Sequence, residues 1–438
     1  MRGLASTIVL AVVLAGLVGY IYFVDAKRSD SGAPKRDKAF TTVAADAIEE
    51  LQIKSADGET SRLRRAEKGW QLVEPNTADA DATELSSLTS SLTGLEVQRV
   101  VDENPADLKQ YGLNPPRVEV GFRLKGDKDF RRLQIGEKTP TGGDLYARKP
   151  DDKKVFLISS YLDNAFNRTP FDLRDKGILK FDREKVDAID LVNGPATLQF
   201  ARKDMDWRIV KPITARADQG AVENLVTRLS SGQMKKLVAA EAADLKEYGL
   251  DKPAVTATVS TGSARASLAI GKTEKDAAYA KDLSRPIVFT VEPALATDLQ
   301  KAIGDYRRKD VFDFRSFSAN RVEIRRGADT VSFEKTKDKD GKEIWRTAAG
   351  QNADTTKVED FLTKLSGLRA KSFEQTQPAA MKSPEITATV RFDENKTETV
   401  TLGRSGSDVF ASRADEAGAA KLDTTPYEDA VKALDALK

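Results

Sequence analysis

The chain has 438 residues, enough for roughly three domains at about 150 residues each, and it contains neither cysteine nor histidine. Their absence excludes disulfides, thiolate nucleophiles, Ser-His-Asp and Cys-His hydrolases, and zinc sites with the usual ligands. Seventy basic and 68 acidic side chains leave a net charge of only +2. The sequence therefore lacks the basic excess that is typical of proteins that bind nucleic acid.

The first predicted element is a membrane anchor. Leu4–Val24 is an uncharged run of 21 residues, which as a helix would span about 31 Å, close to the hydrocarbon thickness of a bilayer. Tyr20, Tyr22 and Phe23 lie at its far end, where an aromatic belt is expected. A cleaved signal peptide is the alternative, but its apolar core is normally shorter. We therefore predict an uncleaved transmembrane helix within residues 1–26.

The next residues, 27–39, are polar and contain Gly and Pro, so they are predicted to form a flexible tether. Arg2 favours a cytoplasmic N-terminus, although Lys27 and Arg28 on the other flank weaken this bias. More than 400 residues behind so short an N-terminal tail are typical of a translocated domain. We predict a single-pass protein of the inner (cytoplasmic) membrane with the bulk of the chain in the periplasm.

The remainder of the chain is an internal repeat. ADLKQYGL at 106–113 recurs as ADLKEYGL at 243–250, which is an offset of 137 residues. Trp70, Trp207 and Trp345 lie 137 and 138 residues apart. A fixed period of this length predicts tandem structural units, which we place at residues 40–180, 181–315 and 316–438 and call the first, second and third repeats.

The first repeat is expected to contain three strands and a helix, followed by about four strands and a short helix. Leucines in the longer helix are spaced three, four and three residues apart, which gives one apolar stripe, and Asp81 is its predicted N-cap. The expected strands are Ile48–Ile53, Thr60–Arg65, Trp70–Val73, Arg117–Leu124, Phe130–Ile135, Leu145–Arg148 and Val155–Ile158, and the helices contain Leu85, Leu88, Leu92 and Leu95, and Tyr161–Phe166.

The second repeat follows the same order, whereas the third is shorter and lacks the Tyr-Gly-Leu sequence, as a terminal capping repeat often does. Its last helix is expected at Pro426–Leu437. The predicted fold class is α+β, with an N-terminal transmembrane helix followed by three tandem repeats of mainly antiparallel strands with packed helices.

Few residues are candidates for a binding site. The Tyr-Gly-Leu turns are interpreted as structural: Asp107 and Asp244 cap a helical turn, Gly112 and Gly249 end it in a left-handed conformation, and the Tyr and Leu side chains enter the core. The three tryptophans could stack on sugars, but one such residue within each alternating strand is more typical of a core anchor whose N–H has a partner.

The loop Glu137–Asp144 is rich in Gly and Thr, but it lacks the spacing of a phosphate-binding loop and joins two strands, so we predict a hairpin. The Lys-rich runs at 149–154 and 335–342 are predicted to be solvated turns. Carboxylate pairs are frequent in a chain this charged and indicate no site by themselves. The sequence predicts no catalytic, metal or cofactor-binding residues, no cofactor, and leaves any binding residues unassigned.

The order of these motifs resembles the bacterial family of uncharacterised proteins called DUF4340. The resemblance rests on a Trp-x-Leu-x-x-Pro strand end, an Asp-Leu-x-x-Tyr-Gly-Leu turn followed by Pro, Ile-Gly-x-x-Thr-Pro-Thr-Gly, Tyr-Ala-Arg and Leu-Arg-Asp-Lys. In this chain they occupy Trp70–Pro75, Asp107–Pro115, Ile135–Gly142, Tyr146–Arg148 and Leu173–Lys176. The resemblance implies no activity and no catalytic residues. It does imply a context, since such proteins are often encoded beside ABC-transport components and gliding-motility-type auxiliary proteins.

These observations favour a non-enzymatic, membrane-anchored, extracytoplasmic accessory or scaffold protein of an envelope or ABC-transport-type complex. Its partners would be the membrane, through the N-terminal helix, and proteins of that complex, with no role for nucleic acid. The alternative is a module that binds a cell-envelope polymer such as glycan, and the third hypothesis is an enzyme based on carboxylates.

Overall fold

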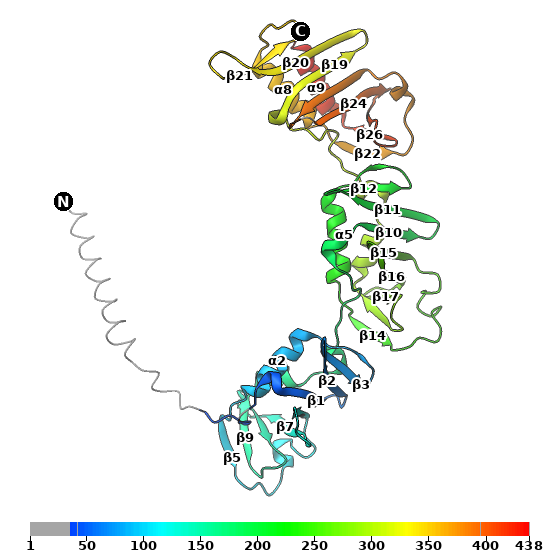
Figure 1. The fold of residues 1–438 in the computed structure, drawn as a ribbon. Helices are drawn as coiled ribbons and strands as arrows, with labels where there is room; N and C mark the ends of the chain where they lie inside the picture. The colour runs from blue at the N-terminus through cyan, green and yellow to red at the C-terminus, as the bar shows by residue number, and fades with distance from the viewer. Residues whose placement is uncertain (1–35, 42, 395, 438) are drawn as a thin grey trace, which may run out of the picture. The chain divides into compact units, whose positions relative to one another are not determined.

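The computed structural model describes residues 36–41, 43–394 and 396–437, which form two compact units divided between Asp175 and Lys176. One antiparallel β-sheet with associated helices forms the first unit, and two further sheets of the same kind form the second (Figure 1). The predicted α+β class with mainly antiparallel strands is therefore confirmed. Among the described residues no helix is both long and apolar enough to cross a bilayer. The anchor predicted within residues 1–26 lies outside them.

The sheet of the first repeat has nine strands in the order β4-β3-β2-β1-β6-β7-β8-β9-β5. Strands β1–β4, from the first half of the repeat, thus form one side of the sheet, and β6–β9, from the second half, form the other. The short strand β5 lies at the edge of the sheet beside β9. The strands are β1 Ile48–Lys54, β2 Thr60–Ala66, β3 Gly69–Glu74, β4 Ala78–Asp79, β5 Arg99–Asp102, β6 Val118–Leu124, β7 Arg131–Lys138, β8 Asp144–Arg148 and β9 Val155–Ser159.

Helix α2 (Ala82–Thr93) covers one face of this sheet because its apolar stripe faces the strands. The Asp81 carboxylate accepts hydrogen bonds from the backbone N–H groups of Thr83 at 2.9 Å and Glu84 at 3.1 Å, which confirms Asp81 as the N-cap. Leu85, Leu88, Leu92 and the following Leu95 are all buried. The short helices α3 (Leu162–Phe166) and α4 (Pro170–Leu173) complete this layer.

The second and third repeats have the same sheet order, except that the third has eight strands because it has no equivalent of β4. The second sheet contains β10 Ala188–Asn193, β11 Ala196–Lys203, β12 Asp206–Lys211, β13 Ala215–Arg216, β14 Lys236–Ala239, β15 Val255–Thr261, β16 Ala264–Thr273, β17 Ala278–Asp282 and β18 Val288–Val291, with helices α5 Gln219–Ser231, α6 Pro293–Leu299 and α7 Ile303–Tyr306. The third contains β19 Ala319–Arg326, β20 Asp329–Lys337, β21 Glu343–Thr347, β22 Ala370–Glu374, β23 Ile386–Phe392, β24 Lys396–Ser405, β25 Asp408–Arg413 and β26 Ala419–Leu422, with α8 Thr355–Ser366 and α9 Thr424–Asp435.

The main core of each repeat lies between the sheet and its helices. In β6 the buried side chains of Val118, Val120 and Phe122 alternate with Glu119 and Arg123 on the opposite face. This is the two-residue period of a strand that is covered on one side. The pattern explains why alternation in the sequence located the long strands correctly.

A second, smaller core lies on the strands from the second half of the repeat, on the sheet face opposite the main core. The Tyr-Gly-Leu turns pack against this face. In the second repeat, Tyr248 and Leu250 pack there with Ala269 and Val288, and the Tyr248 ring lies 5.3 Å from that of Tyr279. The prediction that Tyr and Leu enter a core is therefore confirmed in the second repeat, although this core is the smaller one, on the face that the helices leave free. In the third repeat Met381, in the helical turn η6 Ala379–Lys382, occupies a similar small cluster.

The other features predicted for these turns are present. Gly112 and Gly249 have φ values of +64° and +67°, and the Asp107 and Asp244 carboxylates each accept a hydrogen bond of 2.9 Å from the backbone N–H two residues later. The turn is therefore closed by the Asp side chain at its start and by a left-handed glycine at its end.

Each Tyr-Gly-Leu turn also requires a glycine in the strand beneath it. A Cβ added to Gly136 would collide with the carbonyl oxygen of Tyr111, and one added to Gly271 would collide with that of Tyr248. The Lys272 N–H donates a 2.8 Å hydrogen bond to the same Tyr248 oxygen. This close backbone approach gives a physical reason for the joint occurrence of the Tyr-Gly-Leu and Ile-Gly sequences in the first two repeats.

The alkaline pH dependence of stability provides a test of the core of the second repeat. Tyr306 is 2% exposed, its hydroxyl donates a 2.8 Å hydrogen bond to the Asp298 carbonyl, and burial raises its pKa to about 12. The unfolded tyrosine titrates near pH 10, so the folded protein retains a proton that the unfolded chain loses between pH 10 and 12. Stability should therefore fall over this range, by about 2–3 kcal/mol from this residue.

Urea unfolding of the full chain at several pH values between 9 and 12 measures this effect. We expect Tyr306→Phe to be less sensitive to alkaline pH than the wild type, whereas Tyr161→Phe, at a side chain that is 73% exposed, should follow the wild-type curve. An unchanged pH dependence in Tyr306→Phe would contradict the assignment.

Candidate functional site

The tryptophans do not form a common surface. Trp207 and Trp345 are each 1% exposed in the cores of their sheets, whereas Trp70 is only partly buried. The indole N–H of Trp207 donates a 2.8 Å hydrogen bond to Glu223, while that of Trp345 has no partner among the described residues. The predicted core position is thus confirmed for two of the three, and these two rings are unavailable for stacking on a sugar.

Tryptophan fluorescence tests this difference. Trp70 lies under the guanidinium of Arg65, which is 5.0 Å from its ring centroid, and part of its surface faces solvent. We expect Trp70→Phe to remove most of the emission that acrylamide quenches and to shift the remaining emission to shorter wavelength. Trp207→Phe should leave the quenchable fraction in place, and the reverse ranking would contradict the burial of these rings.

The Gly/Thr-rich loop at 137–144 and the Lys-rich runs at 149–154 and 335–342 were predicted to be turns. Thr139–Gly143 joins β7 to β8, so the hairpin predicted for Glu137–Asp144 is confirmed. The run at 149–154 joins β8 to β9 as expected. The run at 335–342 begins inside β20, and the Lys335 ammonium lies 5.3 Å from the centroid of the Trp345 ring. The solvated turn there is therefore confined to the residues between β20 and β21.

The most highly organised polar site lies within the second compact unit, where the second repeat meets the third. The segment that follows α7 connects the two repeats, and its backbone forms hydrogen bonds with both. The Arg308 N–H donates to the Arg216 carbonyl at 3.0 Å, and the Ala370 N–H donates to the Lys309 carbonyl at 2.8 Å. The Ala417 N–H adds a direct 2.8 Å bond to Thr214. The connection is therefore part of the hydrogen-bonded structure.

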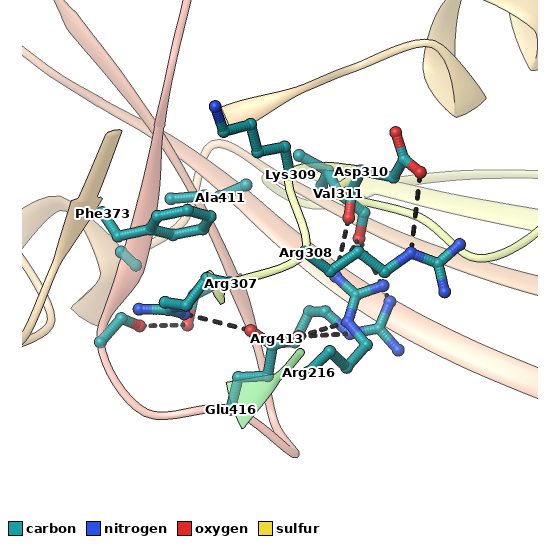
Figure 2. Close-up of a pocket in the computed structure, with 14 residues that line it drawn as sticks. Arg216, Arg307, Arg308, Lys309, Asp310, Val311, Phe373, Ala411, Arg413 and Glu416 are labelled. Carbon is teal, nitrogen blue, oxygen red and sulfur yellow. Dashed lines mark hydrogen bonds and ion pairs between the residues drawn. The ribbon is translucent and has the colours of Figure 1, made fainter. Parts of the chain in front are cut away.

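Glu416, in the loop between β25 and β26 of the third repeat, is the acceptor at the centre of this junction. Arg216 at the end of β13 pairs with one of its carboxylate oxygens, and Arg307 donates to the other at 3.1 Å. The side chains of Glu416, Arg216 and Arg307 are only 8%, 10% and 2% exposed. Two arginines from one repeat therefore bind one buried carboxylate from the next, which we call the junction clamp (Figure 2).

A second carboxylate holds the start of the third repeat. The Glu398 side chain, 3% exposed, accepts hydrogen bonds from the backbone N–H groups of Asp313 and Phe314 at 2.8–3.0 Å and from Arg413 at 2.5 Å. Burial alone would lower the pKa of Arg413, but the hydrogen bond with Glu398 and the charges of nearby aspartates raise it above its ordinary value. Arg413 therefore remains charged.

In this unit, arginine side chains donate hydrogen bonds to the backbone of the segment that precedes each of the two repeats. Arg285 donates to the carbonyls of Gly177 and Ile178 at 2.8 and 2.7 Å. At the next connection, Arg413 donates to the carbonyl of Val311 at 3.2 Å, and Arg216 donates to the carbonyls of Asp310 and Val311 at 2.8 and 3.2 Å. Guanidinium groups suit this role because their several N–H donors have a fixed planar arrangement.

A cavity of about 20 Å³ lies beside the junction clamp, and Figure 2 shows the side chains that surround it. Its lining includes the basic side chains of Arg216, Arg307, Arg308, Lys309 and Arg413 but only two acidic ones, Asp310 and Glu416. Larger surface hollows lie beside Asp127–Arg132 in the first unit, at about 440 Å³, and beside α5 in the second unit, at about 310 Å³. Both are lined by charged groups of mixed sign.

Little in the sequence indicated this junction. Asp172–Lys176 and Asp305–Lys309 are similar in sequence, but neither stretch by itself indicates a contact between repeats. Arg216 and Glu416 are 200 residues apart, so neither local periodicity nor spacing relates them. The part of the chain that the structure describes contains no group of three or more acidic side chains arranged to hold a metal ion.

The fold and the junction define a protein built from tandem α+β repeats, two of which are joined by a buried ionic contact. The profile of the domain of unknown function DUF4340 matches residues 70–206 and 207–386, and the chain belongs to this family. Each matched segment begins at the tryptophan in the third strand of a repeat. The family resemblance drawn from the sequence is confirmed.

Other comparisons identify no characterised relative. A search of curated proteins finds no significant match. Among solved structures, a DNA polymerase sliding clamp from Pseudomonas aeruginosa with ligand is 9% identical, with a TM-score of 0.15 and coverage of 87% of this chain and 92% of that one. A DnaN sliding clamp from the same organism bound to griselimycin is 9% identical with a TM-score of 0.14, and it covers 88% and 93% of the two chains. Neither superposition is close enough to indicate a related fold.

Proposed function

We propose that the protein is a non-enzymatic, membrane-anchored scaffold or accessory subunit of an envelope complex of the ABC-transport type. The observation that carries the proposal is the junction clamp. An ion pair buried to this extent requires both partners in place, and removal of one leaves an uncompensated charge. The junction clamp therefore favours one relative arrangement of the second and third repeats. A scaffold needs such a fixed arrangement in order to present defined surfaces to its partners.

The chemistry of two carboxyl groups that pair with arginines also favours a scaffold over an enzyme. A carboxyl that acts as a general acid near neutral pH usually has a raised pKa. Burial would raise the pKa of Glu50, but hydrogen bonds and charges from Arg62 and Arg123 lower it below its ordinary value. Arg413 and Arg208 likewise lower the pKa of Asp415 against the effect of its burial. These carboxylates are held in the charged state by arginines, which suits structural pairing.

The uncharged run Leu4–Val24 and the polar segment after it support the proposed location, since they place some 400 residues beyond a single predicted membrane helix. A reporter fused after Lys438 tests this topology. We expect activity from a reporter that works only outside the cytoplasm and none from one that works only inside. The opposite result would overturn the extracytoplasmic location.

Binding of a cell-envelope polymer is the alternative that needs a direct test. The full chain in detergent should be mixed with isolated cell-wall polymer and sedimented, with the polymer omitted as control. If the protein is a scaffold, we expect it to stay in the supernatant. If the protein sediments with the polymer and soluble glycan fragments prevent this, the result would favour a polymer-binding module.

A further inference from the structure

Each repeat has a short strand edge just before its longer helix. An alanine there donates its backbone N–H to the carbonyl of the repeat's tryptophan, and the aspartate that follows caps the helix. The three pairs are Ala80–Asp81, Ala217–Asp218 and Ala353–Asp354. The three edges are therefore structurally equivalent. We call each an exit edge, because the chain that leaves the first or second repeat pairs with the edge of that repeat.

The exit edges of the first two repeats are occupied. In the second repeat, the Asp218 N–H donates to the Tyr306 carbonyl at 2.7 Å. The Arg308 N–H donates to the Arg216 carbonyl at 3.0 Å. The first repeat has the same two bonds, each of 2.9 Å, from Asp81 to Leu173 and from Asp175 to Asp79. One antiparallel chain segment therefore covers each of these edges.

The exit edge of the third repeat is open. Within the described part of the chain, the Asp354 backbone N–H has no acceptor and the Asn352 carbonyl has no donor. Both residues are exposed, whereas Arg216, which is equivalent to Asn352, is buried in the second repeat. Unpaired N–H and C=O groups on a strand edge can bind a segment of another chain.

A basic side chain beside this edge also lacks the partner that its equivalent has. Arg208 and Arg346 each follow the tryptophan of their repeat. Arg208 donates to the Asp415 carboxylate of the next repeat at 3.2 Å and to the Asp415 carbonyl at 3.0 Å. Arg346 is exposed and forms no ion pair with any residue that the structure describes. The third repeat thus has a cation where the second repeat contacts a following repeat.

The first repeat has the acidic half of such a junction. Its β8–β9 loop and the β25–β26 loop of the third repeat join cross-strand pairs in the same register through the same number of residues. Asp151 and Asp152 therefore lie at the positions of Asp415 and Glu416, the two acidic residues that contact the second repeat. Asp151 is exposed and has no ion pair among the described residues.

The chain that enters the first repeat also pairs like the chain that enters the other two. The Ala39 N–H donates to the Leu95 carbonyl at 2.8 Å, and the Val97 N–H donates to the Asp37 carbonyl at 2.9 Å. The equivalent bonds run from Ile178 to Gly232 and from Met234 to Lys176, and from Val311 to Leu368 and from Ala370 to Lys309. Arg36 therefore takes the position of Arg308, whose N–H covers the exit edge of the second repeat.

We propose that the open exit edge of one copy of the protein binds the first repeat of a second copy, head to tail. The Arg36 N–H of the second copy donates to the Asn352 carbonyl, and the Asp151 carboxylate of the second copy pairs with Arg346. The contact reproduces the junction between the second and third repeats and goes beyond the scaffold role proposed above. Because the two surfaces differ, the contact is heterologous and extends from copy to copy as an open filament or a closed ring.

Sedimentation velocity of the full chain in detergent, at increasing protein concentration, tests the proposal. We expect the wild type to form species of two or more chains. Arg346→Glu and Asp151→Arg each place like charges opposite each other, so each should weaken association by about tenfold or more. Arg325→Glu makes the same change of charge at an exposed arginine of β19, away from the exit edge, and should associate like the wild type.

A mixture of Arg346→Glu and Asp151→Arg distinguishes a head-to-tail contact from other modes of association. Each variant keeps one intact surface, so the exit edge of Asp151→Arg can bind the first repeat of Arg346→Glu. The mixture should form complexes where neither variant alone does, and a chain with both changes should associate because its charges are exchanged. A wild type that stays a single chain at every concentration, or a mixture that associates no more than its components, would overturn the proposal.

Discussion

Replacement of Gly271 by alanine is expected to lower the free energy of unfolding of the second compact unit by about 3 kcal/mol or more. The new Cβ would collide with the Tyr248 carbonyl oxygen and lie 3.0 Å from the Gly249 carbonyl carbon. Both obstacles are backbone atoms, and β16 is held between β15 and β17. The strand cannot move away without loss of sheet pairing, so the Tyr-Gly-Leu turn must separate from the sheet.

Gly220→Ala is the matched control for this substitution. Gly220 lies in the first turn of α5, where an added Cβ would meet only the Asp218 side chain at an ordinary 3.4 Å. Alanine there should be neutral or stabilise the protein by about 0.4–1 kcal/mol. Urea unfolding followed by circular dichroism gives both values. A Gly271→Ala protein with a wild-type transition midpoint would show that the turn does not approach the strand as described.

Replacement of Glu416 by alanine is expected to destabilise the second unit by about 3–5 kcal/mol, the range for removal of one partner from a buried ion pair. The change leaves Arg307 buried without the Glu416 carboxylate, whereas Arg216 keeps its ion pair with Asp313 at 2.7 Å. Because the interaction joins two repeats, the loss should appear as their separation. Hydrogen exchange should therefore increase at the backbone N–H groups of Ala370 and Ala417, whose acceptors belong to the second repeat.

Asp408→Ala provides the comparison for Glu416→Ala. Asp408 pairs with Lys421 at 2.7 Å within the third repeat, but the two side chains are 44% and 32% exposed. Loss of so exposed a pair should change stability by less than about 1 kcal/mol and leave hydrogen exchange at the junction unaltered. If Glu416→Ala were no more destabilised than Asp408→Ala, the junction clamp would not couple the repeats.

The sequence was most informative where one physical rule decided the structure. Alternation located β1, β2 and β6 because one face of each strand is buried. The helical leucine spacing located α2, and the positive φ of Gly112 agreed with its predicted C-cap role. The short strands β4 and β5 were not predicted, since two to four residues carry no clear period.

The candidate site could not be predicted because it depends on contacts between distant parts of the chain. Nothing local to Glu416 distinguishes it from the other acidic residues, and its burial follows only from the docking of β13 and the connecting segment on the third repeat. The second small core was missed for a related reason. Tyr248 has the apolar character of a core residue, but its sequence does not show which face of the sheet it covers.

Crosslinking of the tagged full chain in intact membranes, followed by identification of the captured proteins, tests the proposed scaffold function most directly. Wild type and Glu416→Ala should be compared at equal abundance, with Asp408→Ala as control. We expect reproducible capture of transporter or envelope-complex subunits by wild type and Asp408→Ala, and reduced capture by Glu416→Ala. Capture of wall polymer without protein partners, or of no neighbour at all, would contradict it.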